Sequence, residues 1–329
     1  MAFSFALFRH NQSFTLALLI IVILFLWIPT FIYPISIEYN GMPLYSIINW
    51  STFNSPYFTS IVAFIIIIIQ GIYINLWVNR HDLIINSSYL PSLLYIILAS
   101  LLPEFRTLSP TLIASIFILL ACDSLLSMYK QKYVDNLVFN ASFLIAIASL
   151  FSFQAVFFYC IVIVALIIFR PFSWREWMIS VCGFLVPYIF IFTWMILTNK
   201  EINVITECFS SIDTLFVSTN VLIRNTVGCL IFILIIISYL KISKYLNSTS
   251  VKIKKGYLLM NWLIVISLIS FLIFHLDGNS RFIYLSIPFS IFLSNYFLLS
   301  PKSFIAEVLF ILFLLTTIFV QINYLCPII

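Results

Sequence analysis

Charged residues are scarce in this chain of 329 residues, and their scarcity excludes a soluble globular fold. Asp, Glu, Lys and Arg make up 8% of the sequence, whereas soluble domains carry about 25%. The six cysteines form no CxxC pair and no cluster with histidine, so neither a structural metal site nor a disulfide framework is expected. Glycine occurs only 6 times and phenylalanine 35 times, a usage that suits helices facing lipid.

Long apolar runs take the place of the missing charges. Hydrophobic residues reach 63% and the mean hydropathy is +1.16, and a helix of about 20 apolar residues crosses the hydrocarbon of a bilayer while satisfying its own backbone hydrogen bonds. The sequence therefore predicts an all-α, polytopic transmembrane helical bundle, a single integral membrane domain over 1–329 with about eleven spans (10–12). The predicted spans are 13–36, 57–78, 86–102, 110–128, 136–152, 155–169, 178–197, 226–241, 257–275, 282–299 and 303–323.

The lysines and arginines predict the orientation of this bundle. With the N-terminus placed inside, 12 of the 16 basic residues fall on the inner side, as the positive-inside rule requires of short loops. The prediction is an N-in, C-out, multi-pass protein of the bacterial inner (cytoplasmic) membrane. Anionic lipid beside the inner loops accounts for the net charge of +5, so no nucleic-acid partner is expected.

The first apolar run could be mistaken for a signal peptide. It follows Arg9 and His10, but it is longer than a secretory apolar region of about 7–15 residues, and no small-x-small cleavage site closes it. We interpret it as an uncleaved first span.

The first outer loop, 37–56, carries the candidate catalytic group. Glu38 is its only acid and is followed by Tyr39 and Asn40, aromatic and amide groups that suit a sugar or a lipid headgroup. An outward carboxylate can act as a general base on an acceptor hydroxyl. The alternative is that the tyrosines belong to the aromatic belt of the membrane interface and that Glu38 is only solvated.

Three other outer segments carry polar residues. Glu104 and Arg106 lie between two spans, as either substrate contacts or a local ion pair. Asp277 and Arg281 flank a polar turn, where the guanidinium could bind a phosphate with two hydrogen bonds. The segment 198–225 has apolar residues at helix-like spacing, which indicates an interfacial helix or a plain connecting loop.

Two inner features are interpreted as structural. In the string RPFSWREW, 170–177, Pro171 ends one helix and Ser173, with Glu176 three residues later, fits a helix cap. Asp123 lies near the inner end of a span and is expected to face the bundle or to reach toward Lys130. The spans hold too few ionisable residues to favour a proton-coupled transporter.

The segment from Leu102 to Lys200 carries a family resemblance. It contains LPEF, SMYK, FNASFLIAIASLF and RPFSWREWMISVCGFLVPY in this order. In these elements it resembles an uncharacterised family of multi-pass inner-membrane proteins of Bacteroidota, which implies no known activity.

A looser resemblance connects the chain with integral-membrane glycosyltransferases of the GT-C type. Those enzymes combine an N-in first helix, an acidic first outer loop and a late helix similar to RFIYLSIP, 281–288. The resemblance implies transfer of a sugar from a polyprenyl-phosphate donor at the outer face, with Glu38 as base and Arg281 on the phosphate. The chain departs from the pattern because Tyr39, rather than a second acid, follows Glu38.

Two functions are therefore carried forward. The first is a lipid-linked-sugar glycosyltransferase whose partners are membrane lipids and a polyprenyl-phosphate lipid. The second is a non-catalytic membrane subunit or scaffold of a cell-envelope complex, with partner subunits in the membrane. Neither function asks for a cofactor or a metal.

The charge distribution makes a testable prediction of orientation. In a cysteine-free background, we expect an impermeant thiol reagent to label Asn40→Cys in intact cells and to label Ser173→Cys only after the membrane is opened, because the two positions lie on opposite sides. Labelling of Ser173→Cys from outside would refute the orientation.

Overall fold

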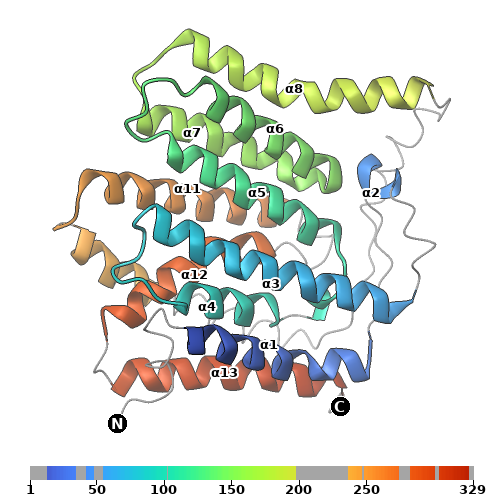
Figure 1. Ribbon diagram of the computed structural model, residues 1–329, viewed down its shortest axis with the longest axis vertical. Coiled ribbons are helices and arrows are strands. Elements are labelled where there is room, and N and C mark those ends of the chain that lie inside the picture. Colours follow the sequence, from blue (N-terminus) through green and yellow to red (C-terminus); the bar gives the residue numbers. More distant parts are fainter. Residues whose placement is uncertain are drawn as a thin grey trace.

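The structure is a computed structural model, and it describes residues 13–34, 42–47, 55–101, 103–197, 236–246, 248–273, 282–300 and 304–325. These residues form helices and the turns between them, without a β-strand. Figure 1 shows most of the helices lying side by side with roughly parallel axes. The predicted all-α class is confirmed.

A helix overlaps each of the predicted spans. The main helices are α1 (Ser13–Ile32), α3 (Pro56–Arg80), α4 (Leu90–Ala99), α5 (Pro110–Ser127), α6 (Asp135–Phe151), α7 (Tyr159–Phe169), α8 (Trp174–Leu197), α11 (Val251–Ile273), α12 (Phe282–Leu298) and α13 (Phe304–Leu325). Shorter elements are α2 (Pro43–Ile47), the 3₁₀ turns η3 (Pro103–Arg106) and η4 (Phe153–Phe158), and a helix at 236–246.

Three of these helices are long and apolar enough to cross a membrane: α3, α8 and α11. On each of them, large apolar side chains remain exposed along the outer face, such as Ile65 on α3, Phe190 on α8 and Trp262 on α11. Exposed apolar surface of this extent is costly in water, but it is what a helix in contact with lipid requires. The structure thus has the features of a membrane protein.

The core of the bundle is formed by α4 and α12. All ten residues of α4 are buried, and so is every residue of α12 after Phe282; a helix that is apolar on all sides belongs in the interior. The two helices pack against each other, and α4 also packs against α3. At ten residues, α4 is about 15 Å long, which is half the thickness of the hydrocarbon layer. The predicted span 86–102 therefore contains a helix too short to cross by itself.

Successive helices reverse direction, so the connecting turns gather at the two ends of the bundle. The turns from α3 to α4, from α5 to α6 and from α7 to α8 lie together at the left of Figure 1. The first of these turns follows Arg80, the second contains Lys130 and Lys132, and the third contains Arg170. We call this the basic end of the bundle. The segment η3, with Arg106, lies at the opposite end.

The outermost helix, α8, is held by a narrow stripe of residues. Its buried positions are Glu176, Ser180, Gly183, Pro187 and Met195, spaced three, four or eight residues apart on one face, and this face packs against α6. Gly183 permits the closest approach: a Cβ there would lie 2.8 Å from the carbonyl oxygen of Phe139 on α6. Small residues let membrane helices approach closely in the same way.

The α6–α8 contact predicts a difference between two adjacent positions. We expect Gly183→Leu to destabilise the protein by about 2–3 kcal/mol, since the added side chain must push backbone aside. Cys182→Leu, at the exposed neighbouring position, should change the stability by less than about 0.5 kcal/mol. Thermal unfolding in detergent micelles measures both, and equal effects would contradict the close contact.

Candidate functional site at the basic end

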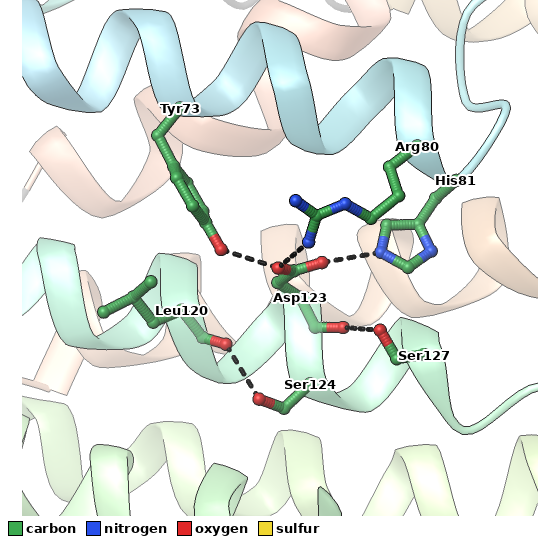
Figure 2. Close-up of polar contacts among 7 residues, drawn as sticks. All are labelled: Tyr73, Arg80, His81, Leu120, Asp123, Ser124 and Ser127. Atoms are coloured by element: carbon green, nitrogen blue, oxygen red, sulfur yellow. Dashed lines mark hydrogen bonds and ion pairs between the residues drawn. The ribbon is translucent and has the colours of Figure 1, made fainter.

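A buried carboxylate joins α3 to α5 near the basic end. Asp123 lies in the penultimate turn of α5, where Tyr73 and Arg80 of α3 and His81, which directly follows α3, surround it (Figure 2). The Tyr73 hydroxyl donates to Oδ2 at 2.6 Å, and Nη1 of Arg80 donates to the same oxygen at 2.9 Å. Nε2 of His81 lies 2.7 Å from Oδ1.

The geometry decides the roles of these groups. An ionised carboxylate can only accept hydrogen bonds, so the Nε2 atom that faces it carries the proton. The side chains of Asp123 and His81 are 12% and 8% exposed, whereas that of Arg80 is 59% exposed. The contacts to Tyr73 and His81 are therefore the shielded ones, and the ion pair with Arg80 is weakened by solvent.

The turn that follows His81 is bound to two more helices, α11 and α12. Asp82 has a φ of 57°, a left-handed conformation that is common one residue past the end of a helix, and its Oδ2 lies 2.5 Å from Nζ of Lys252 on α11. The carbonyl oxygen of Leu83 accepts from Tyr257 of α11 and from Asn295 of α12, both at 2.9 Å. The Asp123 cluster thus lies at a junction of α3, α5, α11 and α12.

A second polar cluster lies deeper in the bundle. Nε2 of Gln70 donates to Oγ of Ser115 at 2.8 Å, and the Tyr95 hydroxyl donates to Oε1 of Gln70 at 2.5 Å. These three side chains come from α3, α5 and α4 and are all buried. Because each polar group has its partner in another helix, the cluster joins the helices without leaving the amide unsatisfied.

The segment RPFSWREW forms the predicted corner, between α7 and α8, but ion pairs and hydrogen bonds replace the predicted helix cap. Glu176 binds the Arg170 guanidinium at 2.8 Å instead of capping the helix, and Nη1 of Arg170 donates to the carbonyl oxygen of Gln131 at 2.9 Å. The Ser173 hydroxyl has no hydrogen-bond partner among the described residues. Arg175 binds Asp135, so the corner is joined to the α5–α6 turn and the start of α6 by one ion pair and by the hydrogen bonds of Arg170 to backbone carbonyl oxygens.

Most of the outer candidates lie outside the described residues: Glu38, Tyr39, Asn40, Asp277 and Arg281. So does the predicted interfacial helix in 198–225. Of the pair in η3, the structure gives the backbone of Glu104 and the whole of Arg106, whose side chain is buried and donates to Oγ1 of Thr30 on α1 at 3.0 Å.

The first outer loop touches the same region through Tyr45, in α2. Its hydroxyl donates to the carbonyl oxygen of Leu108 at 3.1 Å, two residues after Arg106. Burial raises the pKa of Tyr45 to about 12, so the phenol keeps the proton that it donates at neutral pH. The short helix α2 and the residues that follow η3 are thus neighbours.

The cluster around Asp123 was foreseen only in part. The expectation that Asp123 faces the bundle is confirmed, but its partners are Tyr73, Arg80 and His81 rather than Lys130, which lies 5.6 Å from the ring centre of Tyr129. A signal was present in the sequence: Arg80 and His81 close an apolar run at the same end as Asp123, and an acid inside a span requires such partners.

Comparisons of the chain with protein-family models, with curated proteins and with solved structures found no match. The resemblances to a Bacteroidota membrane family and to GT-C enzymes stay predictions from the sequence. Within the part of the chain that the structure describes, no group of three or more His, Cys, Asp or Glu side chains could hold a metal ion.

The Asp123 cluster predicts a large loss of stability on truncation. We expect Asp123→Ala to lower the free energy of unfolding by about 2–4 kcal/mol, because it leaves the buried His81 and the half-buried Tyr73 without their acceptor. Asp135→Ala removes a carboxylate that is paired with a largely exposed Arg175 and should cost less than about 1 kcal/mol.

Chemical denaturation in micelles compares the two variants. Equal losses for Asp123→Ala and Asp135→Ala would show that burial of the Asp123 cluster contributes nothing beyond a surface ion pair. Asp123→Asn, which keeps the shape and an acceptor oxygen, should fall between the wild type and Asp123→Ala.

Proposed function

We propose that the chain is a multi-pass protein of the bacterial inner membrane, N-in and C-out, that transfers a sugar from a polyprenyl-phosphate donor at the outer face. Three apolar helices of spanning length and the gathering of basic turns at one end support the membrane orientation. The GT-C resemblance of the sequence supports the reaction class.

The proposal rests on a contact between two segments that the sequence predicts to be outer, α2 and the region of η3. Tyr45 binds beside η3, and Arg106 of η3 binds Thr30, eight residues before Glu38. Described residues on both sides of Glu38 in the sequence, Thr30 and Tyr45, thus contact a region that contains the buried guanidinium of Arg106. An enzyme of this kind needs its base and its cationic groups at one end of the bundle, on the side where the donor headgroup lies.

The proposed reaction uses the residues of the outer loops in distinct roles. Glu38 takes the proton of an acceptor hydroxyl, whose oxygen forms a bond to the anomeric carbon of the donor sugar. The bond from this carbon to the phosphate oxygen breaks, and polyprenyl phosphate leaves with the electron pair. Arg281 binds the leaving phosphate, while Tyr39, Asn40, Glu104 and Asp277 contact the substrates and the buried Arg106 contributes positive potential nearby.

The second candidate function is a non-catalytic scaffold within a cell-envelope complex. It is favoured by the basic end of the bundle, where Asp123, Glu176 and Asp135 are each bound by cationic groups. Such pairs stabilise the arrangement of helices and leave these acids with a structural role. The scaffold has no need of a base at Glu38.

One pair of substitutions separates the two functions. We expect Glu38→Gln to lower sugar transfer by about 10²–10⁴-fold, since it removes the base, without changing membrane insertion or stability. Glu201→Gln, in the predicted outer segment 198–225, is the matched control and should retain full activity.

Complementation of a deletion strain at equal expression, together with sugar transfer to membranes from a radiolabelled polyprenyl-phosphate donor, measures the effect. If Glu38→Gln complements fully and the wild-type protein transfers no label, the enzyme is excluded and the scaffold becomes the better account.

A further inference from the structure

A lysine-rich segment lies at the basic end of the bundle and includes the end of helix 236–246 and the start of α11. Five lysines fall within 241–255, and no acid occurs anywhere from 236 to 273. In Figure 1 this part of the chain lies at the left, near the turn from α3 to α4. Its lysines are Lys241, Lys244, Lys252, Lys254 and Lys255.

Two of these lysines fix the segment in place. Lys252 binds Asp82 at 2.5 Å, which ties the start of α11 to the α3–α4 turn. Lys241 donates to the Ser300 hydroxyl, and its Nζ lies 5.0 Å from the ring centre of Tyr296 on α12, a cation–π geometry. Lys252 therefore holds the segment against the α3–α4 turn, and Lys241 holds it against the end of α12.

The positive charge of two other lysines is not balanced within the described residues. Lys244 is exposed and Lys255 is half-buried, and neither forms an ion pair with a described acid. Exposed apolar side chains flank them in the chain, Leu240 on one side and Leu258 and Trp262 on the other. Lysines beside a lipid-facing apolar surface lie at the depth of the phospholipid headgroups.

We propose that the segment 241–255 binds the phosphate of an anionic phospholipid, with Lys244 and Lys255 as its charged contacts. The inference rests on the proposed membrane orientation, which puts this end in the cytoplasmic leaflet, where anionic lipids attract basic segments next to a spanning helix. The exposed apolar residues would contact the acyl chains of the same lipid. Free phosphate offers the charge without those chains and should bind more weakly.

The test uses the full chain purified in a neutral detergent and titrated with phosphatidylglycerol. Native mass spectrometry gives the apparent Kd of the first bound lipid, with phosphatidylcholine as the uncharged comparison. Each lysine near an anionic headgroup contributes about fivefold in affinity, so Lys244→Gln with Lys255→Gln should weaken phosphatidylglycerol binding by about 30-fold and leave phosphatidylcholine unchanged.

The matched control is Lys130→Gln with Lys132→Gln, which removes the same charge from the α5–α6 turn at the same end. There, each lysine lies over a neighbouring tyrosine ring, and we expect the Kd to change by less than about threefold. Equal weakening by both pairs, or wild-type affinity after loss of Lys244 and Lys255, would overturn the proposal. Displacement of the lipid by inorganic phosphate at matched ionic strength would assign the site to free phosphate instead.

This experiment is independent of the proposed enzyme. Lipid binding in detergent requires neither Glu38 nor a given orientation in the cell, so its failure leaves sugar transfer untouched. If the orientation test failed, the lipid could no longer be assigned to the cytoplasmic leaflet, but the affinity measured in detergent would stay the same.

Discussion

A carboxylate withdrawn from water must find donors, and the arrangement of helices at the basic end follows from this requirement. Burying an unpaired carboxylate costs far more free energy than a single helix contact returns. Asp123 meets the requirement with Tyr73, about two turns before the end of α3, and with His81 just past it. Because both donors belong to one stretch of chain, α3 and α5 can pack in only one register while all three groups stay paired.

The turn after His81 also fixes the positions of α11 and α12. Once His81 is bound to Asp123, the next two residues present a carboxylate and a carbonyl oxygen to α11 and α12, where Lys252, Tyr257 and Asn295 bind them. Gly256 is part of the same contact, since a Cβ there would lie 2.7 Å from Cδ2 of Leu83. A short polar turn therefore aligns helices that lie more than a hundred residues apart in the sequence.

The sequence predicted where the helices lie better than it predicted which of their faces are buried and which side chains pair. Apolar runs indicate where a helix lies, because both lipid and the protein core require apolar side chains. The predicted span 155–169, for example, coincides with η4 and α7. Apolar runs do not indicate which face is buried: α4 is covered on all sides, while α8 shows most of its surface, although both are apolar. Tertiary position, rather than composition, makes this difference. The pairing of Arg170 with Glu176 was likewise hidden, since a capping box and an ion pair use the same residue types.

The two ends of the molecule combine polar groups in different ways. At the basic end, Asp82, Asp123, Asp135 and Glu176 are each paired with a basic side chain, whereas Lys244 and Lys255 form no ion pair with a described acid. At the opposite end, the one described basic side chain, Arg106, is buried beside the segment that contains Tyr45. A guanidinium there adds positive potential at this end of the bundle without a long side chain reaching into water. In the proposed orientation this end faces the outer leaflet, so an anionic headgroup there would be attracted to the region around Arg106. A buried guanidinium at this end suits the proposed recognition of a charged donor there, whereas the paired acids of the basic end join the helices.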